Sequence, residues 1–241
     1  MHVIAASGMN VTMVSGFFFY LFSLLLRRQL AVFLSVAGII FYDFLTGFQA
    51  SIVRASIMAA LAFSAQILGK QRDGLYILFL TGLVMLLWQP NYLTDVGFQL
   101  SFASTAGILV IPRLLKRFEN GITADLITTF SAQIATLPIL VSGFGVYSIW
   151  SVVVNALVLW TVPILMILGG FAAILTFIFE PLTQLLLYLC LPFLLFFEAV
   201  ANFFARLSGS VSLQNVPWQL VVGYYLILGA ILAFAFQKQH A

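Results

Sequence analysis

Charged side chains are scarce in this chain, at only 7% of its 241 residues. Ten Lys and Arg stand against seven Asp and Glu, which gives a formal net charge of +3. That excess is too small to indicate a nucleic-acid-binding patch from charge alone. So few charges also cannot cover the surface of a soluble domain of this length, which excludes that class of protein.

Cysteine and histidine are nearly missing as well. Cys190 has no second cysteine to pair with, so an intrachain disulfide is excluded and the redox compartment stays open. The only histidines, His2 and His240, form neither an HExxH motif nor a Cys/His cluster. His2 and Ser7 are five residues apart, which turns them about 140° apart on a helix and argues against a catalytic dyad. No G-x-x-x-x-G-K-[ST] motif occurs. We therefore predict no enzymatic activity, no metal site and no cofactor.

Apolar residues take the place of the missing charge. They make up 63% of the chain, with 25 Phe, and the mean hydropathy is +1.15. A membrane span needs about 20 mostly apolar residues, and its backbone polar groups must be satisfied inside a helix. We predict an all-α, polytopic transmembrane bundle, a single domain over 1–241, with nine or ten membrane segments. The apolar tracts fall near residues 3–26, 30–48, 51–68, 75–88, 96–111, 122–141, 147–179, 182–207 and 218–236.

The tract at 147–179 is too long for one span. It contains Pro163 and the pair Gly169-Gly170, so two short helices and one span with a re-entrant piece both remain open. Orientation follows the basic residues of short loops. If every tract crosses once, seven basic residues lie on one side, which is then cytoplasmic, and the chain starts outside: Arg27, Arg28, Lys70, Arg72, Arg113, Lys116 and Arg117.

Two charges lie inside neighbouring tracts. Asp43 and Arg54 are both placed roughly 20 Å from the cytoplasmic face, at about 1.5 Å per residue. A charge at mid-bilayer costs roughly 2.5–3.5 kcal/mol on insertion scales, so each needs a partner or a task. An ion pair between the two helices is expected. It is either a structural clamp or a charged element of a translocation path.

A polar stretch, DVGFQLSFAST, follows at Asp95 to Thr105. Asp95 and Gln99 share one helix face, whereas Gly97, Ser101 and Thr105 form a small-residue row that favours close helix packing. Asp95 could also serve as first-turn charge behind Thr94 as N-cap. Gln99 lies a turn deeper, so we expect it to face protein or water.

Further polar rows lie in later tracts. Thr129, Gln133 and Thr136 share a face just before Pro138, and Glu198, Asn202 and Arg206 step by four. The second row also fits an intrahelical network near the membrane interface. Asn155 is alone in an apolar run, where a single amide most often joins two helices.

Four segments in order resemble the competence domain of the ComEC family, the inner-membrane DNA-uptake channel proteins of natural transformation. HVIAASGMN starts at His2, LTGFQASIVRASIMA at Leu45, DVGFQLSFAST at Asp95 and SAQIATLPIL at Ser131. Asn155 stands where the family places an Asn before an apolar helix. The resemblance covers most of the chain, and DVGFQLSFAST is its most specific part.

This resemblance implies a multi-pass channel in the bacterial cytoplasmic membrane through which one DNA strand enters. The candidate path residues are His2, Ser7, Asn10, Asp43, Arg54, Asp95, Gln99, Gln133 and Asn155. Family members usually carry an OB-like domain and a metallo-β-lactamase-like domain, so the chain is expected to be part of a longer protein. Those domains, other competence machinery and a second copy of the chain are the expected partners, besides single-stranded DNA and the bilayer. Flanking domains on the outer side would require an even number of spans.

Two other functions remain open on the residues alone. The same polar rows and proline-broken helices would suit a small-solute permease with one central pocket. They would also suit a structural membrane scaffold in which every polar group joins two helices.

Overall fold

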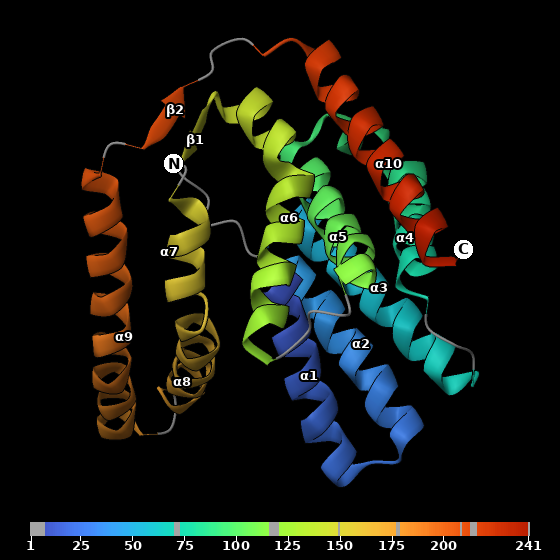
Figure 1. The fold of residues 1–241 in the computed structure, drawn as a ribbon. Helices are drawn as coiled ribbons and strands as arrows, with labels where there is room; N and C mark the ends of the chain where they lie inside the picture. The colour runs from blue at the N-terminus through green and yellow to red at the C-terminus, as the bar shows by residue number, and fades with distance from the viewer. Residues whose placement is uncertain are drawn as a thin grey trace.

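The chain is almost entirely helical in its computed structural model (Figure 1). The structure describes residues 8–69, 73–115, 121–148, 150–176, 179–207, 209–212 and 216–240. In that part the elements run α1 (Gly8–Leu25), α2 (Arg28–Leu45), α3 (Ala50–Ile67), α4 (Gly74–Trp88), the 3-10 helix η1 (Pro90–Thr94), α5 (Val96–Leu115), α6 (Gly121–Phe144), β1 (Val146–Ser148), α7 (Ser151–Val158), α8 (Thr161–Leu175), α9 (Glu180–Arg206), β2 (Ser210–Ser212) and α10 (Trp218–His240).

Five of these helices are long and apolar enough to cross a membrane, namely α2, α5, α6, α9 and α10. Shorter apolar helices lie within α1, α3, α4 and α8. The predicted all-α bundle of membrane-crossing helices is therefore confirmed.

The overlong tract breaks at Leu159 and Trp160 into α7 and α8. Helix α7 runs antiparallel to α9, because Trp150 contacts Phe204 while Trp160 contacts Phe193 and Phe196, further back along α9. Figure 1 shows α7 and α8 following one another beside α9. Of the two alternatives left open by the sequence, the structure shows two short helices, and these follow one another along α9.

Helices α1 to α6 form one group, the first block, to which α10 attaches. Two small cores hold it together: Val11, Ile39 and Ile52 join α1 to α3, and a second core joins α3, α4 and α5 through Ala50, Met85 and Phe98. The second core also shows that the α2–α3 turn, the end of α4 and the start of α5 lie at one end of the bundle. Helices α7 to α9 form the second block, beside the first (Figure 1).

Small residues set the closest contact in the first block. A Cβ on Gly107 in α5 would lie 2.6 Å from the backbone oxygen of Ser131 in α6 and 2.6 Å from Ala135 Cβ. Ser131 itself is fully buried. Glycine is therefore required for α5 and α6 to approach this closely, as small-residue packing of membrane helices predicts.

Helix α10 is tied to α6 by two tyrosines. Pro138 has no N–H to donate to the carbonyl of Ile134, four residues earlier. The Tyr224 hydroxyl donates to that oxygen at 2.9 Å, and the Tyr225 hydroxyl donates to Ala135 O at 2.7 Å. Pro138 thus leaves free one of the two acceptors that attach α10 to α6.

Short strands connect the blocks at one end. β1 pairs antiparallel with β2, with Tyr147 opposite Val211. The α6–α7 link therefore lies beside the α9–α10 link.

Candidate functional site

Arg54 is the clearest candidate for a site in the described part of the chain. It lies on α3 and is only 8% exposed, so its charge is largely removed from solvent. Its Nε donates to Ser101 Oγ of α5 at 2.6 Å, and its Nη1 donates to Met58 Sδ at 3.2 Å. Among the described residues it therefore has only neutral partners. A buried guanidinium without a carboxylate retains the capacity to bind an anion.

Asp43 lies on α2 and faces the side of α3 opposite to Arg54. It is 6% exposed. Its Oδ1 accepts a hydrogen bond from Ser56 Oγ at 2.8 Å, and Ser56 Oγ also donates to Ile52 O at 2.9 Å. Positions 54 and 56 are about 200° apart around a helix with 3.6 residues per turn. The predicted ion pair is not formed, because Asp43 meets the Ser56 face of α3 while Arg54 points to α5.

The DVGFQLSFAST stretch builds the turn that leads into α5. Asp95 accepts from the backbone N–H of Phe98 at 2.7 Å, so Asp95 itself is the N-cap, in place of Thr94. Gln99 donates from Nε2 to Leu93 O at 2.7 Å and closes η1 against α5. Gln99 was predicted to face protein or water; it is half-buried, and its partner is the neighbouring turn. Both side chains therefore hold the loop that positions Ser101.

An aromatic stack supports the same turn. Phe98 is buried, lies flat against Tyr92 at 5.9 Å between ring centres, and contacts Phe102 at 4.3 Å. Burial, followed by the charges of Asp95 and Asp43, raises the pKa of Tyr92, so its phenol stays protonated and can donate a hydrogen bond. The stack fixes the start of α5 and with it the partner of Arg54.

The other predicted path residues do not gather at Arg54 in the described structure. His2 and Ser7 lie outside the described residues, and the side chain of Asn10 in α1 is not described either. Gln133 is half-buried in α6, and Asn155 is exposed on α7 of the second block. The row of Glu198, Asn202 and Arg206 is exposed on α9.

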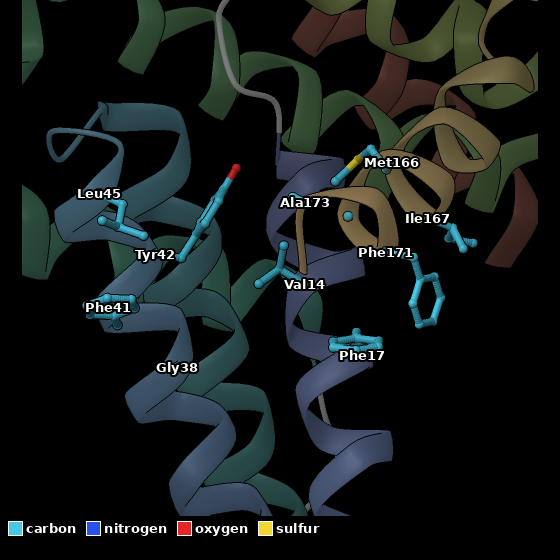
Figure 2. A pocket seen from close by; sticks show the side chains of 11 residues that line it. Val14, Phe17, Gly38, Phe41, Tyr42, Leu45, Met166, Ile167, Phe171 and Ala173 are labelled. Atoms are coloured by element: carbon cyan, nitrogen blue, oxygen red, sulfur yellow. The ribbon is translucent and has the colours of Figure 1, made fainter. Parts of the chain in front are cut away.

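Two cavities flank the helices of the first block. One, of about 490 Å³, separates α1 and α2 from α8; Figure 2 shows Phe17, Tyr42 and Phe171 around it. Its lining includes no charged residue. The other, of about 510 Å³, lies between α2, α3 and α4 and is lined in part by Asp43, Ser56, Gln89 and Tyr92. The first is an apolar seam between the blocks, and only the second has ionic character.

Two features were missed at the level of sequence. Ser56 could have been assigned to Asp43, because a hydroxyl nearly two turns inside α3 is level with a carboxylate near the end of α2. Tyr224 on α10 could have been matched to the Ile134 carbonyl that Pro138 leaves without a helical donor. Both matches require knowing which helices are neighbours, and a local sequence pattern does not predict that.

Comparison with known proteins places the chain in a family. The family model described as Competence protein matches residues 1–238. The chain is 29% identical over 157 residues to ComE operon protein 3 of Bacillus subtilis (strain 168), which covers 65% of this chain and 20% of that protein. It is 29% identical over 232 residues to an uncharacterized protein of Aquifex aeolicus (strain VF5), which covers 95% of this chain and 53% of that protein.

No solved structure matches the chain. It spans about a fifth of one relative's length and about half of the other's. Since the family model covers nearly the whole sequence and the four quoted segments lie within it, the chain belongs to the Competence protein family.

Proposed function

We propose that this chain takes part in DNA uptake during competence, as the part of a cytoplasmic-membrane channel through which one DNA strand passes. The observation that carries the proposal is Arg54, a buried cation between α3 and α5 with only neutral partners among the described residues. Membership of the Competence protein family supports it. Neighbouring domains and other competence machinery are the proposed partners that deliver and pull the strand.

The proposed role of Arg54 is to bind phosphate groups in transit. A guanidinium binds phosphate through its forked N–H groups, and the bond is stronger where water is excluded. Ser101 holds Nε at 2.6 Å, which orients the fork while Nη2 stays free of any hydrogen bond to a described residue. One such contact is weak enough for the next phosphate to replace it.

The acidic residues do not oppose this path. Asp43 lies on the opposite side of α3, bound to Ser56, and Asp95 is occupied as the N-cap of α5. An anionic strand beside Arg54 would therefore meet a hydroxyl and a thioether before it met a carboxylate.

Uptake of labelled DNA tests the proposal. A transformable cell that lacks its own channel would express this protein, and internalised single strands would be measured. We expect uptake to be restored. A permease or a scaffold predicts no internal DNA in the same cells, even though the protein reaches the membrane.

Cysteine protection tests the path itself. Cys190 is the only cysteine of the chain, so Cys190→Ala gives a clean background. A thiol introduced by Met58→Cys lies beside Arg54, and one introduced by Tyr188→Cys lies on the exposed face of α9. With DNA stalled by a bulky end, we expect the thiol at position 58 to react more slowly and that at 188 to react unchanged. Equal rates with and without DNA would place the path elsewhere.

A further inference from the structure

The cavity between α2, α3 and α4 has a polar end and an apolar end. Asp43, Ser56, Gln89 and Tyr92 line it near the α2–α3 turn and η1, where the helices end. Val36 and Ala60 line it about two turns of α2 and one turn of α3 further in. A ligand that fills it must therefore carry one polar end and one hydrocarbon end.

The polar end is complementary to a positive charge. Asp43 is 6% exposed, and only its Oδ1 accepts a hydrogen bond, from Ser56, among the described residues. No Lys or Arg lines the cavity. A buried carboxylate is stable only when it is paired or neutralised, so a cation on the ligand is the complementary group.

The same end offers hydrogen-bond donors beside the carboxylate. The Gln89 side-chain amide and the Tyr92 hydroxyl make no hydrogen bond to another described residue, and both line the cavity. These donors suit a phosphate ester a few ångströms from the cation. The rings of Phe48 and Trp88, which also line the cavity, are exposed at the helix ends, as aromatic side chains are where lipid headgroups begin.

We propose that this cavity binds one phospholipid with a primary ammonium headgroup, of the phosphatidylethanolamine type. The ammonium group pairs with Asp43, the phosphate accepts from Gln89 and Tyr92, and one acyl chain lies along Val36 and Ala60. The bilayer around the chain supplies such an amphiphile directly. The site is separate from Arg54, which lies on the other side of α3, and so does not depend on the proposed DNA path.

Native mass spectrometry of the purified full chain tests the proposal. Phosphatidylethanolamine and phosphatidylglycerol with identical acyl chains would be titrated into the detergent-solubilised protein. We expect one ethanolamine lipid to be retained at a concentration at least about tenfold lower than the glycerol lipid, because one charge-assisted contact is worth about 1.4 kcal/mol or more. Asp43→Asn should abolish this preference. Asp73→Asn, which removes an exposed carboxylate at the far end of α4, should keep it.

A second variant separates loss of binding from loss of fold. Ala60→Phe leaves Asp43 in place and fills the apolar end, so it should reduce retention of both lipids. Equal retention of the two lipids by the wild type would overturn the proposal, as would a preference that survives Asp43→Asn. Displacement of the lipid by free ethanolamine at equal concentration would also overturn it, because the cavity would then be a site for a soluble amine.

Discussion

The two blocks differ in how far they bury polar residues within their apolar helices. In the first block Asp43, Arg54 and Ser131 are buried, each with a hydrogen-bond partner in the described structure. In the second block Asn155 and Glu198 are exposed on α7 and α9. The first block therefore encloses these polar groups between helices, while the second exposes Asn155 and Glu198 to its surroundings. A polar residue in an apolar tract thus indicates a site only when neighbouring helices enclose it.

Packing explains the contrast. In the first block, glycine and serine let α5 and α6 touch, and α3 lies between α1, α2, α4 and α5. In the second block, α9 contacts α7 and α8 through Trp150 and Trp160 on one side. Most large apolar side chains on the rest of α9 are exposed, so that surface is available to lipid or to another protein.

The largest expected effect comes from replacing a buried arginine, with an exposed arginine replaced in the same way as the control. Arg54→Gln should lower DNA uptake about tenfold to hundredfold, because it removes a charge-assisted phosphate contact of about 1.5–3 kcal/mol. Arg206→Gln, at the exposed end of α9, should change uptake less than threefold. Both proteins must reach the membrane in equal amounts. Equal losses in the two variants would show that burial does not mark the path.

The next prediction is that a Gly→Ala substitution changes the free energy of unfolding in opposite directions in the two blocks. Gly107→Ala should destabilise the protein by about 1–3 kcal/mol, because the added Cβ collides with the backbone of α6. Gly169→Ala in α8 meets nothing within 4 Å and should stabilise by up to about 1 kcal/mol through helix propensity. Unfolding in detergent measures both. Destabilisation by Gly169→Ala would mean that the second block is as tightly packed as the first.

A smaller difference is expected between two acidic residues at helix starts. Asp95→Ala should cost about 1 kcal/mol, because the side chain caps Phe98 N in α5. Glu180, in the first turn of α9, makes no capping hydrogen bond in the described structure. Its replacement by Ala should cost about 0.3–1 kcal/mol at most, through the helix dipole. The same unfolding measurement ranks the two, and a reversed order would contradict the cap.

The smallest effect concerns the attachment of α10. Tyr224→Phe and Tyr225→Phe should each cost about 0.6 kcal/mol, the average for hydrogen bonds between membrane helices. Tyr188→Phe on α9 removes a hydroxyl that makes no hydrogen bond to a described residue, since Tyr188 is 72% exposed, and should cost nothing measurable. Protease accessibility of the link before α10 provides the readout. Unchanged accessibility in the double variant would mean that α10 is attached by other contacts.

Much of the architecture could be predicted from local patterns. Apolar tracts located the helices, and the length of the 147–179 tract correctly marked it as more than one helix. The break lies at Leu159 and Trp160, however, and Pro163 and the Gly169-Gly170 pair lie inside α8. A place for Asp95 at the start of α5 was one of the readings left open, but its role as the cap itself required the loop geometry of η1. The direction of α7 and α8 was not predictable, because two short helices can turn back or continue. The contacts of Trp150 and Trp160 with α9 fix the direction of α7, and Figure 1 shows α8 continuing from it beside α9.

The sequence by itself determined the membrane class, the helical content, the order of the segments and the residues too polar for lipid. These follow from the free energy of transferring side chains and backbone into hydrocarbon, which depends on composition along a single helix. Only the tertiary structure decided which polar residues meet. Asp43 and Arg54 are level along their helices and opposite in charge, yet the rotation of α3 directs one toward Ser56 and the other toward Ser101. That rotation is set by packing against four neighbouring helices, and no single helix encodes it.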